Sequence, residues 1–380
     1  VAMQNSQIDI QNKRLERLEG EIREKDDLIK GLPKGNMVYA ASTHFKGQGQ
    51  FKPTNGKPRV IRFLHRGEVT QPRDEVSPGT LPIFKAEPWQ FNLPADHDES
   101  DRRAALAKWL VRRDHPLTWR VIVNRAWQWH FGEGLVASPN DFGELGQTPS
   151  HPELLDWLAL YFRDQGGSFK RLHKLLVMSA TYRQSSAGNE TFAREDSGNR
   201  LLWRMNRRKL SAEEIRDAVL SVSGKLNLEM GGPGYYLFAL EKTAHSPHYE
   251  YHKFNPEDSR SHRRSIYRFI VRSQPNPFMT TLDCADSSQS TPKRNETLTA
   301  LQALSLLNNK FSVAMARHFA ARLEREKEDL AGQVARGHLL VTGRAPVKEE
   351  AALLLDYARK YGLQNLCRAL FNLSEFSYLD

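Results

Sequence analysis

The sequence predicts a mainly helical fold, with a small β or irregular segment and an N-terminal helical, coiled-coil-like arm. Two observations predict it. From residue 96 onward, most apolar residues recur at helical spacing. Between residues 34 and 95, glycines and prolines interrupt short apolar stretches that look like strands. Because the sequence lacks the strand–helix alternation of a doubly wound sheet, we expect a multi-helical domain instead.

We expect three regions: a helical arm over residues 1–33, a β-containing or irregular segment over 34–95 and a helical domain over 96–380. In the arm, apolar residues follow a 3-4 spacing that Lys25 interrupts. This pattern covers fewer than four heptads, so it fits a short coiled coil or one half of a helical hairpin. The residues are Leu15, Leu18, Ile22, Ile29 and Leu32.

Within the other two regions, turn and cap residues set the expected elements. Ser150 with Glu153, and Ser211 with Glu214, read as capping boxes, and Gly132 suits the end of a helix. Ser168 is a further expected N-cap. Strands are expected over residues 36–42 and 58–67, and extended chain over 231–238 and 263–272. Helical segments are expected over 102–113, 116–132, 150–167, 168–185, 210–226, 349–362 and 363–376, and one long helix or a helix pair over 296–327.

Composition limits the classes of function. Lys and Arg number 55 against 45 Asp and Glu, which gives a net charge of +10. This charge permits binding to nucleic acid or acidic polysaccharide, but it also fits a solvated basic surface, and no nucleic-acid motif accompanies it. Mean hydropathy is −0.61, and no run approaches the roughly 18 apolar residues of a membrane span. The two cysteines, Cys284 and Cys367, could form one bridge, but buried thiols are the expected state.

The stretch HFGEGLVASPNDFGELGQTPSHPELLDWL is the first candidate site. His130, Asp141 and His151 could perform general acid–base chemistry near neutral pH, with Asn124 and Arg125 as ligand-binding neighbours. The alternative is a scaffold, in which the same polar residues satisfy backbone groups of a long connection. Motifs of the common enzyme classes, such as a Walker loop, G-x-S-x-G or H-E-x-x-H, do not occur.

Basic residues in WRMNRRKL form the second candidate, with Arg207 and Arg208 as ligand-binding residues for anionic groups. Such side chains also bridge helices by pairing with carboxylates, and Asp283 and Asp286 are possible partners. The same alternatives apply to Arg204 and Lys209, and to Arg263 and Arg264 in SHRRS.

The third candidate is HSPHYEYHKF. His245, His248 and His252 with Glu250 have spacings loosely compatible with a metal, but no second cluster completes a familiar site, so we predict no metal. Nearby tyrosines could instead form a stacking surface for sugars or a partner. These tyrosines are Tyr235, Tyr236, Tyr249 and Tyr251.

Several segments occur in an order that resembles one family. They include HPLTWRVIVNRAWQWHFGEGLVASPNDFGELGQTPSHPELLDWLALYF, NRLLWRMNRRKLSAEEIRDAVLSVSGKL, TALQALSLLNNKF and LCRALFNLSEFSYLD. Together they resemble the planctomycete-specific PSD-one domain over roughly residues 60–380. The resemblance implies a C-terminal part of an exported or cell-envelope multidomain protein, in which any haem belongs to upstream modules and this chain holds no cofactor.

The resemblance implies no established activity. The sequence therefore favours a non-enzymatic interaction or scaffold domain. Its expected partners are other domains of the same polypeptide or envelope proteins, with acidic polysaccharide as a further candidate. The alternative is a hydrolase that acts on a polysaccharide or another anionic substrate through His130, Asp141, His151 and Arg125. Binding of nucleic acid or another polyanion is a third hypothesis, based on net charge alone.

Overall fold

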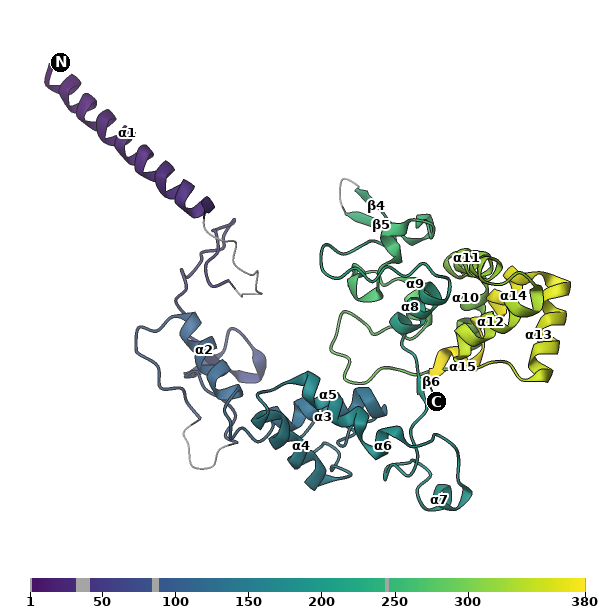
Figure 1. Cartoon of the computed structure of the whole chain (residues 1–380). Helices are drawn as coiled ribbons and strands as arrows, with labels where there is room; N and C mark the ends of the chain where they lie inside the picture. The colour runs from purple at the N-terminus through teal and green to yellow at the C-terminus, as the bar shows by residue number, and fades with distance from the viewer. Residues whose placement is uncertain (1, 32–41, 84–88, 243–245, 380) are drawn as a thin grey trace. The chain divides into compact units, whose positions relative to one another are not determined.

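The computed structural model describes residues 2–31, 42–83, 89–242 and 246–379 (Figure 1). In that part the chain forms α-helices α1 to α15, four short 3-10 helices and six strands of two to four residues, so the predicted mainly helical class is confirmed. The chain divides into two compact units, residues 1–111 and 112–380. The predicted boundaries at 33 and 95 stay predictions.

The first unit begins with α1 (Ala2–Gly31), the helix expected for the arm. The apolar side chains of its residues 13–31 are exposed, with Leu15 at 59% and Ile22 at 58%, and its pairing as a coiled coil stays a prediction. Strands β1 (Arg62–Leu64) and β2 (Pro72–Glu75) pair antiparallel, and α2 (Glu99–Leu110) follows. The strand expected over 58–67 is shorter than predicted because the chain turns at Arg66, whose φ is 50°. The strand expected over 36–42 lies outside the described residues, except for residue 42.

The second unit begins with five helices: α3 (Thr118–Phe131), α4 (Pro152–Asp164), α5 (Phe169–Met178), α6 (Ala180–Arg183) and α7 (Glu190–Glu195). One face of each of the first three is apolar, and these faces bury a common cluster, which we call the α3–α5 core. Its buried members include Val123, Trp127, Phe131, Leu155, Leu158, Phe162, Leu172 and Leu176.

The helix ends test the predicted caps. Gly132 ends α3 with a φ of 82°, and Ser168 accepts a hydrogen bond from the Arg171 amide at the start of α5, as predicted. The prediction of a capping box at Ser150 is wrong. The N-cap of α4 is His151, because Pro152 occupies the first helical position, where its fixed φ and missing N–H are tolerated.

The remaining elements are short strands and helices. They are β3 (Arg208–Lys209), α8 (Ala212–Val222), β4 (Ala239–Lys242), β5 (Pro247–Glu250), α9 (Pro277–Thr281), α10 (Ala300–Asn308), α11 (Lys310–Glu326), α12 (Leu330–Thr342), α13 (Lys348–Tyr361), α14 (Leu363–Leu370), α15 (Ser374–Ser377) and β6 (Tyr378–Leu379). β4 pairs with β5, and β3 pairs with β6 at the C-terminal end, both antiparallel. The capping box of Ser211 and Glu214 at α8 is confirmed.

Three segments differ from or refine the predictions. Residues 296–327 contain a helix pair, which breaks where Asn309 caps α11 through the Phe311 amide. The segment 263–272 is largely not strand: it turns through a 3-10 helix at Ser265–Tyr267, and Arg268 makes an isolated bridge to Tyr235. Helix α12 was not predicted. Its Gly337 lies so close to α11 that a Cβ there would stand 3.0 Å from Leu323, so this glycine serves close packing of two helices.

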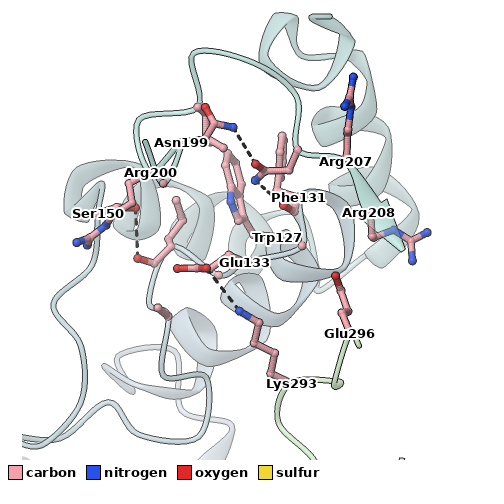
Figure 2. Close-up of a pocket in the computed structure, with 17 residues that line it drawn as sticks. Trp127, Phe131, Glu133, Ser150, Asn199, Arg200, Arg207, Arg208, Lys293 and Glu296 are labelled. Atoms are coloured by element: carbon pink, nitrogen blue, oxygen red, sulfur yellow. Dashed lines mark hydrogen bonds and ion pairs between the residues drawn. The ribbon is translucent and has the colours of Figure 1, made fainter. Parts of the chain in front are cut away.

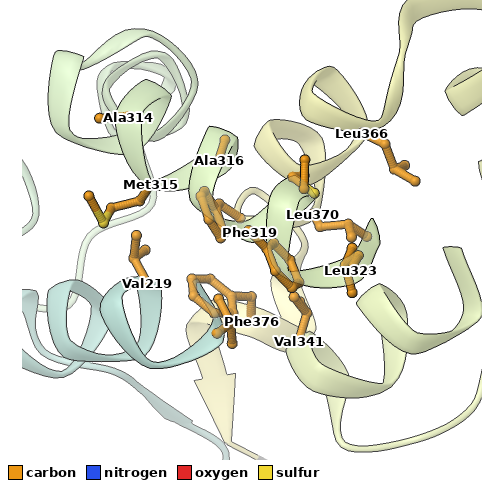
Figure 3. Close-up of a cluster of buried hydrophobic side chains, with 14 of the residues drawn as sticks. Val219, Ala314, Met315, Ala316, Phe319, Leu323, Val341, Leu366, Leu370 and Phe376 are labelled. Atoms are coloured by element: carbon orange, nitrogen blue, oxygen red, sulfur yellow. The ribbon is translucent and has the colours of Figure 1, made fainter. Parts of the chain in front are cut away.

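A second core joins α8 to α11, α12 and α14. Figure 1 shows α11, α12, α13 and α14 gathered together, in the colours of the C-terminal part of the chain. We call it the α11–α14 core. Phe319 and Phe371 stack at its centre, with ring centroids 5.9 Å apart. Figure 3 shows how side chains from α8, α11, α12 and α14 meet there; its buried members include Val219, Met315, Leu323, Val341, Leu366, Leu370 and Phe376.

Candidate functional site

Two neighbouring hollows in the second unit share Gly132, Arg208, Lys293 and Glu296. The first measures about 210 Å³ and the second about 390 Å³. We call them together the basic cleft. The first lies at the C-terminal end of α3, and Figure 2 shows its lining, with Lys293 directed toward Glu133.

A chain of amide hydrogen bonds builds one wall of the first hollow. Asn206 donates from Nδ2 to the carbonyl oxygen of Phe131 at 3.0 Å, and this carbonyl lies at the open end of α3. Asn199 donates from Nδ2 to Asn206 Oδ1 and to the Arg204 carbonyl, both at 2.8 Å. Asn199 is buried and has a φ of 51°. These bonds fix the loop that carries Arg200, Arg207 and Arg208.

Strand β3 positions Arg208, which lines both hollows. Arg208 forms two hydrogen bonds of 3.1 Å with the Glu214 carboxylate. Burial alone would raise the Glu214 pKa, but hydrogen bonds from Arg208 and Ser211 outweigh it, so the pKa is lowered and the carboxylate stays ionised. The Arg208 guanidinium is therefore held by a bidentate pair at the junction of the hollows.

Lys209 is buried beneath the cleft. Its Nζ donates to Asp283 Oδ2 at 2.9 Å, to the Thr297 carbonyl at 2.6 Å and to Gln302 Oε1 at 3.0 Å. Burial acts to raise the Asp283 pKa, but the hydrogen bonds that its carboxylate accepts from Lys209, Thr297 and Gln302 outweigh burial and lower it. The predicted pairing of this basic segment with Asp283 is confirmed for Lys209, which has a structural role. Asp286 instead accepts hydrogen bonds from Ser288 and Gln289.

The cleft carries both signs of charge and an exposed aromatic ring. Trp129 lines the second hollow and is 61% exposed. Six cationic side chains line the two hollows: Arg200, Arg207, Arg208, Lys209, Lys293 and Arg294. Four carboxylates accompany them: Glu133, Glu214, Asp283 and Glu296. Lys293 lies 3.5 Å from Glu133, and Arg294 lies 3.3 Å from Glu213. The lining is thus basic but able to accept as well as donate hydrogen bonds.

The three residues proposed for acid–base chemistry have separate hydrogen-bond partners. His130 Nε2 lies 2.8 Å from His173 Nδ1 on α5. Asp141 is exposed, and its carboxylate accepts from the Gly143 amide at 2.9 Å. His151 Nδ1 lies 3.0 Å from the Ser150 hydroxyl. These three side chains are all described, and neither hollow of the cleft has any of them in its lining. Their catalytic role stays a prediction.

Asn124 and Arg125 tie the same loop to α3. Asn124 is fully buried; its side chain donates to the Val136 carbonyl at 3.0 Å and accepts from the Val136 amide at 2.8 Å. Arg125 donates to Asn140 Oδ1 at 2.6 Å. Asn124 and Arg125 line neither hollow, whereas Arg207 and Arg208 line the cleft.

The histidine and tyrosine candidates are dispersed. His252 lies 3.1 Å from Glu250, His248 is exposed on β5, and His245 lies outside the described residues. Among the residues that the structure describes, no group of three or more metal-binding side chains comes together. Tyr235 is buried, so the four tyrosines do not form a single exposed surface.

Arg263 is also buried, and it donates to the carbonyls of Pro233 and Gly231 and packs over the Tyr267 ring. Arg204 lies over Trp203. Cys284 and Cys367 are both free thiols. The contacts of Arg263 and Arg204 therefore fit the interpretation that these side chains bridge parts of the fold.

Sequence reasoning missed the cleft residues outside WRMNRRKL. Lys293, Arg294 and Glu296 stand in a loop that shows no motif, and Trp129 belongs to an apolar helix pattern. The loop reaches α3 across a separation of 164 residues, where Gln128 donates to the Pro292 carbonyl. The one signal in the sequence for a role of Trp129 in the cleft was its position, three residues before Gly132, where the helix ends.

A mainly helical domain with a basic cleft is thus the class of protein that fold and site define. The family model described as a protein of unknown function (DUF1553), called PSD1, matches residues 102–358, and the chain belongs to this family. The match is shorter than the resemblance expected over 60–380. Nothing among curated proteins or solved structures matches the chain. In the described part of the chain, no helix is long and apolar enough to span a membrane.

Proposed function

We propose that this chain is an interaction module that binds acidic polysaccharide in the basic cleft. The observation that carries the proposal is the exposed Trp129 ring beside Arg208, Lys293 and Arg294 in the second hollow. An aromatic face offers apolar contact to a sugar ring, while arginine and lysine pair with the carboxylate of a uronic acid.

The mixed charge of the cleft favours a sugar over nucleic acid. The carboxylates of Glu133 and Glu296 can accept hydrogen bonds from sugar hydroxyls. An internal deoxyribose of DNA offers these carboxylates no hydroxyl donor, whereas each uronic acid offers ring hydroxyls. Net charge alone supports either ligand, so the distribution of charge within the cleft decides our choice.

The setting of this module belongs to the same proposal. From the family resemblance we infer an exported, multidomain protein of the cell envelope, in which the cleft attaches other modules of the polypeptide to polysaccharide. Any haem would be held by upstream modules. We favour binding over hydrolysis because His130, Asp141 and His151 each have a different partner in the fold.

The test is a titration of the purified chain with polygalacturonate and with neutral dextran at two salt concentrations. We expect saturable binding of polygalacturonate that weakens as salt rises, because screening reduces charge pairing. Trp129→Ala should weaken it by about fivefold to tenfold, in line with roughly 1 kcal/mol for a ring contact. Trp157→Ala is the matched control, because Trp157 is also exposed, at 52%, on α4.

Three outcomes would contradict the proposal. One is dextran binding as tightly as polygalacturonate, and another is equal loss in Trp129→Ala and Trp157→Ala. The third is single-stranded DNA binding more tightly than polygalacturonate with the same sensitivity to Trp129→Ala, which would establish nucleic-acid binding instead.

A further inference from the structure

A separate cavity of about 370 Å³ lies between the segment after β5 and the first turns of α9 and α11. Its walls are mostly aromatic and aliphatic. They comprise Leu237, Tyr251, Phe254, Pro277, Phe278 and Phe311, and the polar lining consists of Arg216, His252, Asn276, Asn309 and Lys310. Its volume is at the lower end of the range of about 300–1,000 Å³ found for small-molecule sites. We call it the aromatic cavity.

Arg216 supplies a buried positive charge to one wall. Its side chain is 1% exposed, and its guanidinium lies 5.2 Å from the Phe311 ring centroid and 5.3 Å from that of Tyr235. It donates to the carbonyls of Ser261 and Arg263. The adjacent Asp217 lies 3.7 Å away, and its carboxylate also accepts hydrogen bonds from Ser265. The guanidinium therefore has one charged partner, Asp217, and its other donors bind neutral carbonyls and the Ser265 hydroxyl.

Lys310 adds a second positive charge at the first residue of α11. Its Nζ donates to the carbonyls of His252 and Phe254 and lies 5.6 Å from the Phe254 ring centroid. Carbonyl oxygens carry no net charge, so this ammonium, unlike Arg216, has no neutralising carboxylate among the described lining residues, and it supplies the unneutralised charge of the cavity. The N-terminus of this 17-residue helix contributes further positive potential at the same point.

Apolar rings and unneutralised positive charge select one kind of ligand. We propose that the aromatic cavity binds a small aromatic carboxylate, with its ring among Tyr251, Phe278 and Phe311 and its carboxylate toward Lys310. The rings remove the apolar part of the ligand from water, while the carboxylate supplies the anion that the lining lacks. A neutral aromatic compound would gain only the first of these contributions. The proposal does not depend on the basic cleft.

The experiment titrates the full chain with naphthalene-2-carboxylate, and with naphthalene-2-methanol as the neutral analogue, by isothermal calorimetry. We expect saturable binding of the carboxylate to one site and at least tenfold weaker binding of the alcohol. Lys310→Met should weaken carboxylate binding by at least tenfold and leave alcohol binding unchanged. Lys310→Arg should restore most of the loss, because it keeps the charge.

Lys348→Met is the matched control, since Lys348 is the first residue of α13 as Lys310 is of α11. It should leave carboxylate binding unchanged, as should Trp129→Ala in the basic cleft. Thermal unfolding of each variant shows whether it folds. If Lys310→Met does not fold, the charge-preserving Lys310→Arg is compared with the wild type in its affinity for the acid and for the alcohol.

Several results would overturn the inference: no saturable binding by the folded wild type, equal affinity for acid and alcohol, or equal loss in Lys310→Met and Lys348→Met. A short peptide that ends in phenylalanine and binds more tightly than naphthalene-2-carboxylate would overturn the assignment to a small molecule in favour of a chain terminus.

Discussion

The two cores of the second unit are held together in different ways. The α3–α5 core brings together segments that are near one another in sequence, and a buried amide, Asn124, fastens the loop between α3 and α4. The α11–α14 core receives α8 from about a hundred residues away and is filled by stacked rings. Its polar links include Arg322, which donates to the carbonyls of Ser221 and Val222 at the end of α8, and the buried Ser223 hydroxyl, which donates to Met315 Sδ at 3.5 Å.

The two regions are therefore sensitive to different kinds of substitution. A long connection over a local core needs specific hydrogen bonds, because its backbone groups have few other partners. A core of distant segments depends on buried apolar area, because the free energy gained by burying that area must offset the entropy lost in closing a long loop. Removal of a buried hydrogen bond should therefore affect the α3–α5 core most, and removal of a buried apolar ring should affect the α11–α14 core most.

The largest expected effect is in the α11–α14 core. Phe319→Ala should reduce the free energy of unfolding by about 3–5 kcal/mol, because Phe319 is 0% exposed and its removal leaves a cavity against Phe371. Chemical denaturation measures the change. Leu353→Ala on α13 is the control; this leucine is 71% exposed and should give a change within about 0.5 kcal/mol. Equal effects would contradict the assignment of the core to these rings.

The next effect tests the polar fastening of the α3–α5 core. Asn124→Ala should cost about 2–4 kcal/mol, because it leaves both the Val136 amide and carbonyl buried without a partner. Asn140→Ala removes the exposed Arg125 bond in the same loop and should cost less than about 0.5 kcal/mol. Similar losses in the two variants would show that the buried amide does not fasten the loop.

Removal of a helix cap should give a smaller difference in the free energy of unfolding between the two regions. Ser211→Ala removes a two-way capping box at α8 whose Glu214 also binds Arg208, so we expect a loss of about 1–2 kcal/mol. Ser168→Ala removes a single cap bond at α5 and should cost about 0.5–1 kcal/mol. Denaturant midpoints at constant slope measure both losses. A greater loss at Ser168 would reverse the comparison.

The smallest expected effect is a pH dependence of the α3–α5 core. Burial, and then the neighbouring His173 and Arg208, lower the pKa of His130 below its ordinary value of 6.5. The folded state therefore favours the neutral ring, while the unfolded chain binds the proton more readily. Stability from this group is complete above about pH 6.5 and is lost as the pH falls through the lowered folded pKa.

His130→Gln should therefore lose less stability than the wild type between pH 8 and pH 5, as measured by urea unfolding. His248→Gln, at an exposed position on β5, serves as the control and should follow the wild type. Parallel curves for His130→Gln and the wild type would exclude this contribution.

Several elements could be predicted from the sequence because their signals are local. The Ser211 box, the Ser168 cap and the helix end at Gly132 each depend on a few neighbouring residues. The prediction failed at Ser150, where Pro152 shifts the helix start by one residue, and at α12, whose glycines hid a helical pattern. Gly337 in α12 has its reason in Leu323 and Leu370, which belong to other helices.

The candidate site shows the same division. Arg207 and Arg208 were predicted as ligand-binding residues because they stand together in a basic motif, and they line the basic cleft. Trp129 and Glu296 could not be predicted as their neighbours. The aromatic cavity had only a partial signal: Tyr251 was a candidate for a stacking surface, whereas Arg216 and Lys310 lie in distant segments and look unremarkable there.

The sequence by itself determined the helical class, most helix positions and the family, since these depend on periodicity, caps and ordered motifs within single segments. The tertiary structure alone decided which polar side chains hold the fold and which line a cleft. Asn124 and Arg216 are buried and hydrogen-bonded within the fold, whereas Arg207 is exposed in the lining of the cleft, and only the packing of the chain fixes that difference.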